Sequence, residues 1–475
     1  RASLTAGDEV RARRAAAMAA PEAAPALAHL VRAADAIRAG DWRRAERELD
    51  RTEGDAVQDM LARTLMVWVR VGQRRTDEAV SQLAPLTTLR PYGGLFSYQQ
   101  AMAFDIAGRR DEARTAYDTA ANGGMFLPPA AERHADALVR WGARDEALAM
   151  LARINAGRNN AALNAFGQRI EAGGRVNALT PARAAAIGLY GFGAILLQQE
   201  HNISAGLIAE SLAMMIDPSL DDARLLFAEG HARSERYDIA RQALSGVRTN
   251  SPYTQTARAM EARLLLEEGR GEQALAIASA NAAGGDPRAL RALGDMYVAL
   301  DRLGEAEPIY SALLAEDEAN WMLHFARGAV REQLGRWDEA EADLRRALEI
   351  APEQPEVLNY LGYTWVDRGE NLEEGLAMIR RAAELRPNSA AIIDSLGWAH
   401  FKLGDYRQAL LFLERAVELE PGSATLNDHL GDVYWRLGRR TEARFQWRRA
   451  LSQEPEDAAA IEHKLEHGLP DSAPL

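Results

Sequence analysis

The 475-residue chain contains no cysteine, which excludes a disulfide framework, a thiolate metal site and a cysteine nucleophile. It has no run approaching the ~20 apolar residues that a membrane-spanning helix needs. It also lacks a phosphate-binding glycine loop, a dinucleotide-binding glycine turn and a serine nucleophile elbow. These absences predict a chain that is not an enzyme, with no catalytic residue, no metal and no cofactor.

Positive charge is in deficit, since 56 Lys and Arg residues face 69 Asp and Glu residues and the net charge is -13. An acidic chain is not expected to take a nucleic-acid backbone or an anionic membrane surface as its main partner. The sequence starts at Arg1 and shows no signal-peptide hydrophobic segment. We interpret it as a processed or trimmed chain, whose lipid anchor, if it has one, would lie upstream of residue 1.

The last third of the chain contains a regular repeat of small residues. Its glycines are separated by 34, 34, 35 and 34 residues: Gly294, Gly328, Gly362, Gly397 and Gly431. An alanine follows most of these glycines after 12 residues: Ala306, Ala340, Ala409 and Ala443. The exception is Gly375, 13 residues after Gly362, and one extra residue around Asn371 explains both this 13 and the spacing of 35. A proline then ends the units: Pro352, Pro387, Pro421 and Pro455.

A 34-residue period of this kind is typical of the tetratricopeptide repeat, in which each unit is a pair of helices, A and B. The glycine of helix A and the alanine of helix B let the two backbones approach closely. Glycines at the A-to-B turn predict a left-handed cap there: Gly335, Gly369, Gly404 and Gly438. The predicted fold is therefore all-α, an α-solenoid forming a right-handed superhelix of about twelve helix-turn-helix repeats.

The same spacing recurs more weakly before residue 287. We place degenerate repeats in 1–154 and 182–286, five regular repeats in 287–457, and a capping helix with a tail in 458–475. In 155–181 the spacing fails, and this irregular segment is either a hinge or one degenerate repeat with shortened helices. The first nine residues are polar and are expected to be frayed.

The expected capping helix carries one string that resembles a metal motif, His463-Lys464-Leu465-Glu466-His467. Zinc hydrolases with this string need a further acidic ligand far downstream, and only eight residues follow His467 here. We therefore interpret the helix as a polar cap, with Glu462, Lys464 and Glu466 facing outward.

The A helices of such a solenoid line its concave side. In tetratricopeptide proteins, helix-A positions three before, one after and five after the glycine contact ligands. By this resemblance, with one aromatic position added, the candidate partner-binding residues are Asn359, Tyr363, Asp394, Trp398, Phe401, Lys402, Asp428, Asp432, Trp435 and Arg436. Aromatic side chains and Arg suit a protein or an extended peptide, and the two cations favour an acidic one. The alternative is that the two tryptophans pack between neighbouring repeats.

Three strings carry a narrower resemblance: Asn359-Tyr360-Leu361-Gly362-Tyr363, Asp394-Ser395-Leu396-Gly397-Trp398, and His429-Leu430-Gly431-Asp432-Val433-Tyr434-Trp435. Over roughly residues 355 to 455 the chain resembles a family of long bacterial tetratricopeptide proteins that includes the LbcA-type outer-membrane lipoproteins. Members of that family are adaptors that hold carboxyl-terminal processing proteases together with cell-wall (peptidoglycan) hydrolase substrates. The resemblance implies a periplasmic scaffold, tethered to the outer membrane.

Two other functions compete with the adaptor. One is a generic scaffold in envelope secretion or polysaccharide assembly. The other is a cytosolic cochaperone that grips acidic peptide C-termini, which ranks lowest because Asp394, Asp428 and Asp432 would repel a terminal carboxylate.

Overall fold

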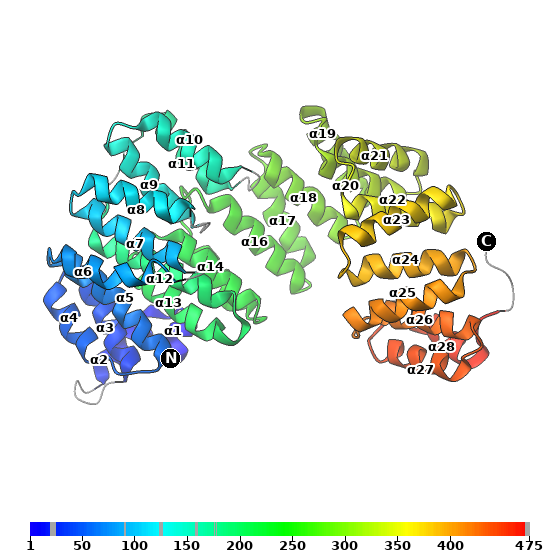
Figure 1. Ribbon diagram of the computed structural model, residues 1–475, viewed down its shortest axis with the longest axis horizontal. Helices are drawn as coiled ribbons and strands as arrows, with labels where there is room; N and C mark the ends of the chain where they lie inside the picture. The colour runs from blue at the N-terminus through cyan, green and yellow to red at the C-terminus, as the bar shows by residue number, and fades with distance from the viewer. Residues whose placement is uncertain are drawn as a thin grey trace. The chain divides into compact units, whose positions relative to one another are not determined.

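The computed structural model describes residues 1–19, 25–89, 92–122, 127–156, 160–174, 176 and 178–470. Within this part of the chain it contains 28 α-helices, two 3-10 helices and no strand, which confirms the all-α prediction. The chain divides into two compact units, Arg1–Gly284 and Gly285–Leu475 (Figure 1). The predicted tail beyond residue 470 and Gly157 of the irregular segment lie outside the described residues.

The first unit is built from antiparallel helix pairs and a few additional helices. Its elements are α1 (Ala2–Thr5), α2 (Glu9–Met18), α3 (Ala26–Ala39), α4 (Trp42–Asp50), α5 (Ala56–Gly72), α6 (Thr76–Leu83), η1 (Ala84–Leu86), α7 (Gly93–Ile106), α8 (Arg110–Asn122), α9 (Pro128–Arg140), α10 (Arg144–Asn155), α11 (Ala161–Glu171), α12 (Pro181–Leu197), η2 (Glu200–Asn202), α13 (Ile203–Ile216), α14 (Asp221–Ala232), α15 (Tyr237–Ser245), α16 (Thr254–Glu267) and α17 (Gly271–Ala282).

One helix pair of this unit, α12 and α13, lies inside it rather than following the preceding pairs around the surface. Residues 184–193 of α12 and 206–216 of α13 are all buried, as expected of helices that are apolar on every side. Helix α12 packs on α5 and α7, and α13 packs on α1 and α3 (Figure 1). The interior of the N-terminal repeats is therefore occupied by a pair from much later in the chain.

The N-terminal residues are ordered by this internal pair, so the expectation that they are frayed is wrong. Leu4 is buried, and its carbonyl oxygen accepts a hydrogen bond from the Ser211 hydroxyl on α13. Gly7 lies close to the ring of Phe227 on α14. A single apolar side chain and one buried hydrogen bond hold a segment that looks polar in the sequence.

The segment 155–181 contains one helix, α11, in its described residues. The Asn160 side chain caps it by accepting hydrogen bonds from the backbone N–H groups of Ala162 and Leu163. Leu163 and Phe166 are buried in a cluster shared with α9 and α10. The choice between a hinge and a degenerate repeat stays a prediction.

The second unit contains five helix pairs and one additional helix among its described residues. They are α18 (Pro287–Ala299), α19 (Leu303–Glu316), α20 (Trp321–Gln333), α21 (Trp337–Ile350), α22 (Pro355–Arg368), α23 (Leu372–Leu385), α24 (Ala390–Lys402), α25 (Tyr406–Leu419), α26 (Ala424–Arg436), α27 (Arg440–Leu451) and α28 (Ala458–His467). With seven pairs in the first unit, the described helix pairs match the expected twelve repeats.

The turn chemistry of the second unit follows the repeat. The turn glycines have positive φ, for example +73° at Gly369, as the C-cap prediction requires. Asn371, at the expected extra position, also has positive φ, at 43°. Asparagine tolerates this conformation better than most residues, so the inserted residue fits without disturbing the next helix.

Helix α28 closes the last repeat. Glu462 and Glu466 are exposed, as expected, but the prediction for Lys464 is wrong, because its ammonium group points inward at two aspartates of α26. The buried carboxylate of Asp432 and the half-buried one of Asp428 attract the lysine more strongly than solvent does.

Candidate functional site

The A helices α20, α22, α24 and α26 of the second unit line a groove of about 470 Å³. Three of the sequence-predicted residues lie in its wall, namely Asn359, Tyr363 and Asp394. The small residues at the A–B seams bring each pair together, so that one helix of every repeat is left to form this shared face. The resemblance-based positions on α22 and at the start of α24 therefore do converge on one surface.

The α22 part of the groove combines aromatic rings with an unpaired amide oxygen. The Tyr360 hydroxyl donates a hydrogen bond to Glu332 across to α20 at 3.0 Å. Burial raises the pKa of the half-buried Tyr363 to about 12, so its phenol stays neutral. Asn359 Oδ1 has no hydrogen-bond partner among the described residues. The oxygen has almost no accessible surface, and a turn of the Asn359 side chain toward the groove would let it accept a hydrogen bond from a bound chain.

Asp394 is engaged with His429, which was not among the candidate partner-binding residues. His429 Nδ1 lies 2.9 and 3.0 Å from the two oxygens of the Asp394 carboxylate. Burial disfavours the charged imidazole most strongly, but the charge and hydrogen bond of Asp394, together with the charges of Asp432 and Asp428, outweigh it and raise the pKa of His429. His429 lies two residues before Gly431, a position that the ligand-contact rule omits, so only its place next to Asp428 in the sequence could have indicated it.

Trp398 stacks between Phe401 on one side and the same histidine, His429, on the other. The Trp398 ring lies 4.6 Å from the Phe401 ring and 4.0 Å from the His429 ring, measured between centroids. This stack joins α24 to α26, which is the packing role that we gave as the alternative for Trp398. The aromatic residues therefore rigidify the edge of the groove.

Lys402 pairs with a carboxylate of the neighbouring repeat. Its ammonium lies 3.1 Å from Asp367 of α22, which is itself in the groove wall. The charge of Lys402 is thus neutralised by Asp367. The groove itself is lined by several carboxylates: Glu332, Asp367, Asp394 and Glu420. The groove is acidic, which opposes the expectation that Lys402 attracts an acidic partner.

The predicted residues of α26 are covered by α28 and the segment after it. Lys464 lies 2.7 Å from Asp428 and 2.9 Å from Asp432, and Trp447 donates a hydrogen bond to Asp432 at 2.9 Å. Burial raises the pKa of Asp432 to about 6, although Lys464 opposes this shift. The acidic side chains of the last repeat therefore hold the chain's own cap.

Trp435 and Arg436 are engaged in the same way. Trp435 Nε1 donates to the carbonyl oxygen of Leu469 at 3.3 Å, and Arg436 donates to that of Pro470 at 2.8 Å. The guanidinium of Arg440 lies 3.7 Å from the centre of the Trp435 ring. The structure thus splits the predicted site into an open part on α22 and α24 and a covered part on α26.

The two histidines of the metal-like string lie on α28 with ring centroids 4.6 Å apart. Within the described ranges, no three His, Cys, Asp or Glu side chains gather in a metal-binding arrangement.

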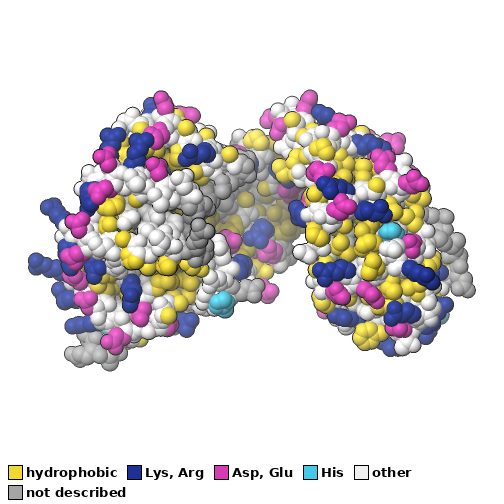
Figure 2. Space-filling view, in the orientation of Figure 1, with side chains coloured by type: hydrophobic (Ala, Val, Ile, Leu, Met, Phe, Trp, Pro, Cys, Tyr) yellow, Lys and Arg dark blue, Asp and Glu magenta, His cyan; other side chains and the backbone are white. Residues whose placement is uncertain are grey.

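No helix in the described part of the chain combines the length and apolar character needed to cross a membrane. On the face shown in Figure 2, acidic and basic side chains are interspersed over the described surface.

Sequence models of the tetratricopeptide repeat match residues 291–355, 325–390 and 400–463. These ranges carry the 34-residue spacing and coincide with the regular helix pairs of the second unit. This part of the chain consists of tetratricopeptide repeats. Repeats of this family form surfaces for binding other proteins, so the coarse function is a protein-interaction scaffold.

Several solved structures resemble this chain at low identity. A tetratricopeptide repeat protein from Parabacteroides merdae is 16% identical, with a TM-score of 0.44 over 52% of this chain and 97% of that one. The Cut9–Hcn1 hetero-tetramer of the APC/C gives 15% identity and a TM-score of 0.46 over 94% and 90%. YrrB, described as having an unusual peptide-binding site, gives 21% and 0.31 over 38% and 92%. No curated protein matches the chain.

Proposed function

We propose that this protein is a non-enzymatic adaptor that binds an extended polypeptide segment in the groove of the second unit. Asn359 carries the proposal, because its unpaired oxygen lies in a wall shared by consecutive A helices. A peptide backbone N–H would satisfy it, and Tyr363 would pack against an adjacent side chain. The surrounding carboxylates favour a neutral or basic segment over an acidic one.

The finer role that we propose rests on the family resemblance of residues 355 to 455. In this role the chain brings a carboxyl-terminal processing protease together with cell-wall hydrolases in the periplasm, tethered to the outer membrane by a lipid anchor. Separation of inner- and outer-membrane fractions tests the compartment. The generic envelope scaffold is the remaining alternative, and it predicts peptide binding without any effect on proteolysis.

The direct test is reconstitution with a purified processing protease and a cell-wall hydrolase. We expect the hydrolase to be cleaved faster when the adaptor is present, because both bind one scaffold. The variant Asn359→Ala with Tyr363→Ala should weaken capture about tenfold or more, through loss of a hydrogen bond and an aromatic contact. The measurement is the apparent dissociation constant by pull-down or interferometry, together with the cleavage rate.

Glu349→Ala is the matched control, because Glu349 is exposed on α21 outside the groove. Unchanged cleavage on addition of the adaptor would contradict the protease role. If the folded double variant captures both proteins as well as the parent does, the groove is not the binding site.

A second prediction concerns charge. Raising the salt concentration from about 0.05 M to about 0.5 M should weaken binding of the partner segment severalfold, because exposed charge attraction is screened. Asp367→Asn should weaken binding at low salt and flatten this dependence, since it removes one carboxylate and leaves Lys402 unpaired. Asp338→Asn, exposed on α21, should change neither quantity. Binding that strengthens in Asp367→Asn would indicate an acidic partner.

A further inference from the structure

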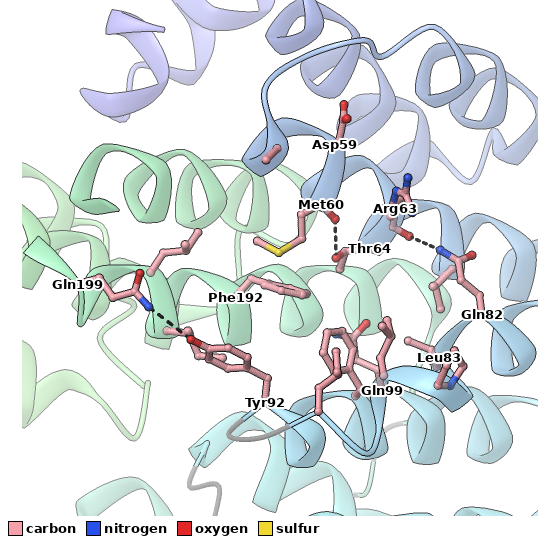
Figure 3. A pocket seen from close by; sticks show the side chains of 18 residues that line it. Asp59, Met60, Arg63, Thr64, Gln82, Leu83, Tyr92, Gln99, Phe192 and Gln199 are labelled. Carbon is pink, nitrogen blue, oxygen red and sulfur yellow. Dashed lines mark hydrogen bonds between the residues drawn. The ribbon is translucent and has the colours of Figure 1, made fainter. Parts of the chain in front are cut away.

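The first unit contains a cavity of about 750 Å³ that is separate from the peptide groove. Its walls come from α5, from α6 and η1, from α7 and from α12 (Figure 3). It exists because α12 enters the interior of the N-terminal repeats without filling it. Gly191 lets α12 approach α7 closely, since a Cβ at this position would lie 2.4 Å from Leu95.

The walls of the cavity are mainly apolar. Figure 3 shows Met60, Leu83 and Phe192, which come from different elements, around the same space. Phe192 packs edge-on against Phe96, with ring centroids 5.7 Å apart. Leu89, which also lines the cavity, is 47% exposed and therefore lies at its mouth. A cavity of this size, lined in this way, is typical of small-molecule sites.

One polar side chain lies inside this apolar enclosure without a partner. Gln99 of α7 is 1% exposed and lines the cavity, yet neither Oε1 nor Nε2 makes a hydrogen bond among the described residues. Trp68 Nε1 is unpaired at the same spot, since a Cβ added to Gly188 would lie 3.0 Å from it and 3.3 Å from Gln99 Oε1. Leaving a buried amide unpaired is costly, so Gln99 defines the polar end of a ligand site, with the Trp68 indole behind it.

We propose that this cavity binds an uncharged amphiphile, a single hydrocarbon chain ending in a neutral group that both donates and accepts hydrogen bonds, such as a carboxamide. The head pairs with the Gln99 amide once this side chain, whose amide atoms have almost no accessible surface here, turns its donor and acceptor toward the cavity. The chain runs between Met60 and Phe192 toward Leu89 at the mouth. The charged residues of the lining, Asp59 and Arg63, are more exposed than the buried Gln99. A charged head next to Gln99 is therefore disfavoured, because it would be buried without an opposite charge. This site is independent of the proposed peptide groove.

Displacement of the fluorescent probe N-phenyl-1-naphthylamine tests the proposal, with decanamide and methyl decanoate as competitors. Their acyl chains are the same, but the ester cannot donate a hydrogen bond. Decanamide should displace the probe at about fivefold lower concentration than the ester. In Gln99→Leu the two competitors should become equivalent, while the variant melts no lower than the parent, because it loses an unpaired buried amide.

Filling the cavity tests its location. Met60→Trp should abolish probe binding, and Ile195→Trp on the α12 wall provides a second filling variant if the first does not fold. Leu411→Trp is the control, because Leu411 is exposed on α25 of the second unit. The proposal is overturned if neither competitor displaces the probe, if both are equally potent against the parent, or if the folded filling variants keep their binding.

Discussion

Gly362→Ala is expected to lower the free energy of unfolding of the second unit by about 3 kcal/mol, the upper end of what overpacking costs. A Cβ on Gly362 would lie 2.7 Å from the carbonyl oxygen of Gly375, so helices α22 and α23 would have to separate. Gly397 differs in this respect, because its Cβ would meet the Leu413 side chain at 2.7 Å, and a side chain can move. Thermal and denaturant unfolding followed by circular dichroism measures the loss.

Gly304→Ala is the matched control for this substitution. Gly304 lies in α19, and a Cβ there would have no atom within 4 Å. Alanine should leave the unfolding free energy unchanged or raise it by roughly 0.5–1 kcal/mol, because it restricts the unfolded chain. If Gly362→Ala and Gly304→Ala unfold at the same temperature, close backbone contact is not what requires glycine in the repeat.

Asp222→Asn is expected to stabilise the first unit by an amount that grows with pH. Burial raises the pKa of the Asp222 carboxyl from 3.8 to about 8, and nearby acidic groups such as Glu132 add to the shift. The unfolded chain releases this proton near pH 4 and the folded chain only near pH 8. Stability contributed by the neutral carboxyl is thus complete below about pH 4 and is lost as the pH rises to about 8.

The difference between Asp222→Asn and the parent should therefore rise from near zero at about pH 4 to about 5 kcal/mol at about pH 8. Taking the difference matters, because burial lowers the pKa of His134 to about 4, which makes stability rise with pH below about 6.5 in both proteins. Asp118→Asn, exposed on α8, should show no such trend. A difference that stays constant across this range would show that Asp222 is ionised in the folded state.

The regular repeats were predictable because their information is local. The recurrence of Gly362 and its equivalents identifies the helix crossings, and the extra residue at Asn371 was located by the spacing alone. A 34-residue period repeats the same short-range contacts, so each unit can be read from its own residues and those of its neighbour. The left-handed turn glycines follow from the same logic.

The interior position of α12 and α13 was not predicted, because it depends on contacts between distant parts of the chain. The repeat spacing around Gly193 identified the pair as one more repeat. The missed signal was composition, since Ala185 to Phe192 contains no charged residue and offers no polar face to solvent. Counting the apolar residues on each face of α12 and α13 would have predicted that both helices are buried. It would not have predicted which helices surround them.

The candidate site was partly predictable for a similar reason. The helix-A positions indicated Asn359, Tyr363 and Asp394, which lie together in one wall, while their role in binding stays a prediction. They also led to Asp428 and Asp432, whose contacts with Lys464 come from a helix outside the repeat spacing. Position within a repeat indicates which side chains share a face. It does not indicate which of these side chains are already bound by another segment of the same chain.

The contacts of α28 set how this solenoid could change in length. Lys464, together with the backbone at Leu469 and Pro470, saturates the concave side of the repeat formed by α26 and α27. A unit added directly after α27 would have to break these contacts. A unit inserted before α26 would keep them and lengthen the groove by one helix. The number of helices that line the groove can therefore change by insertion of a repeat before α26. The contacts between α28 and the last repeat would stay the same.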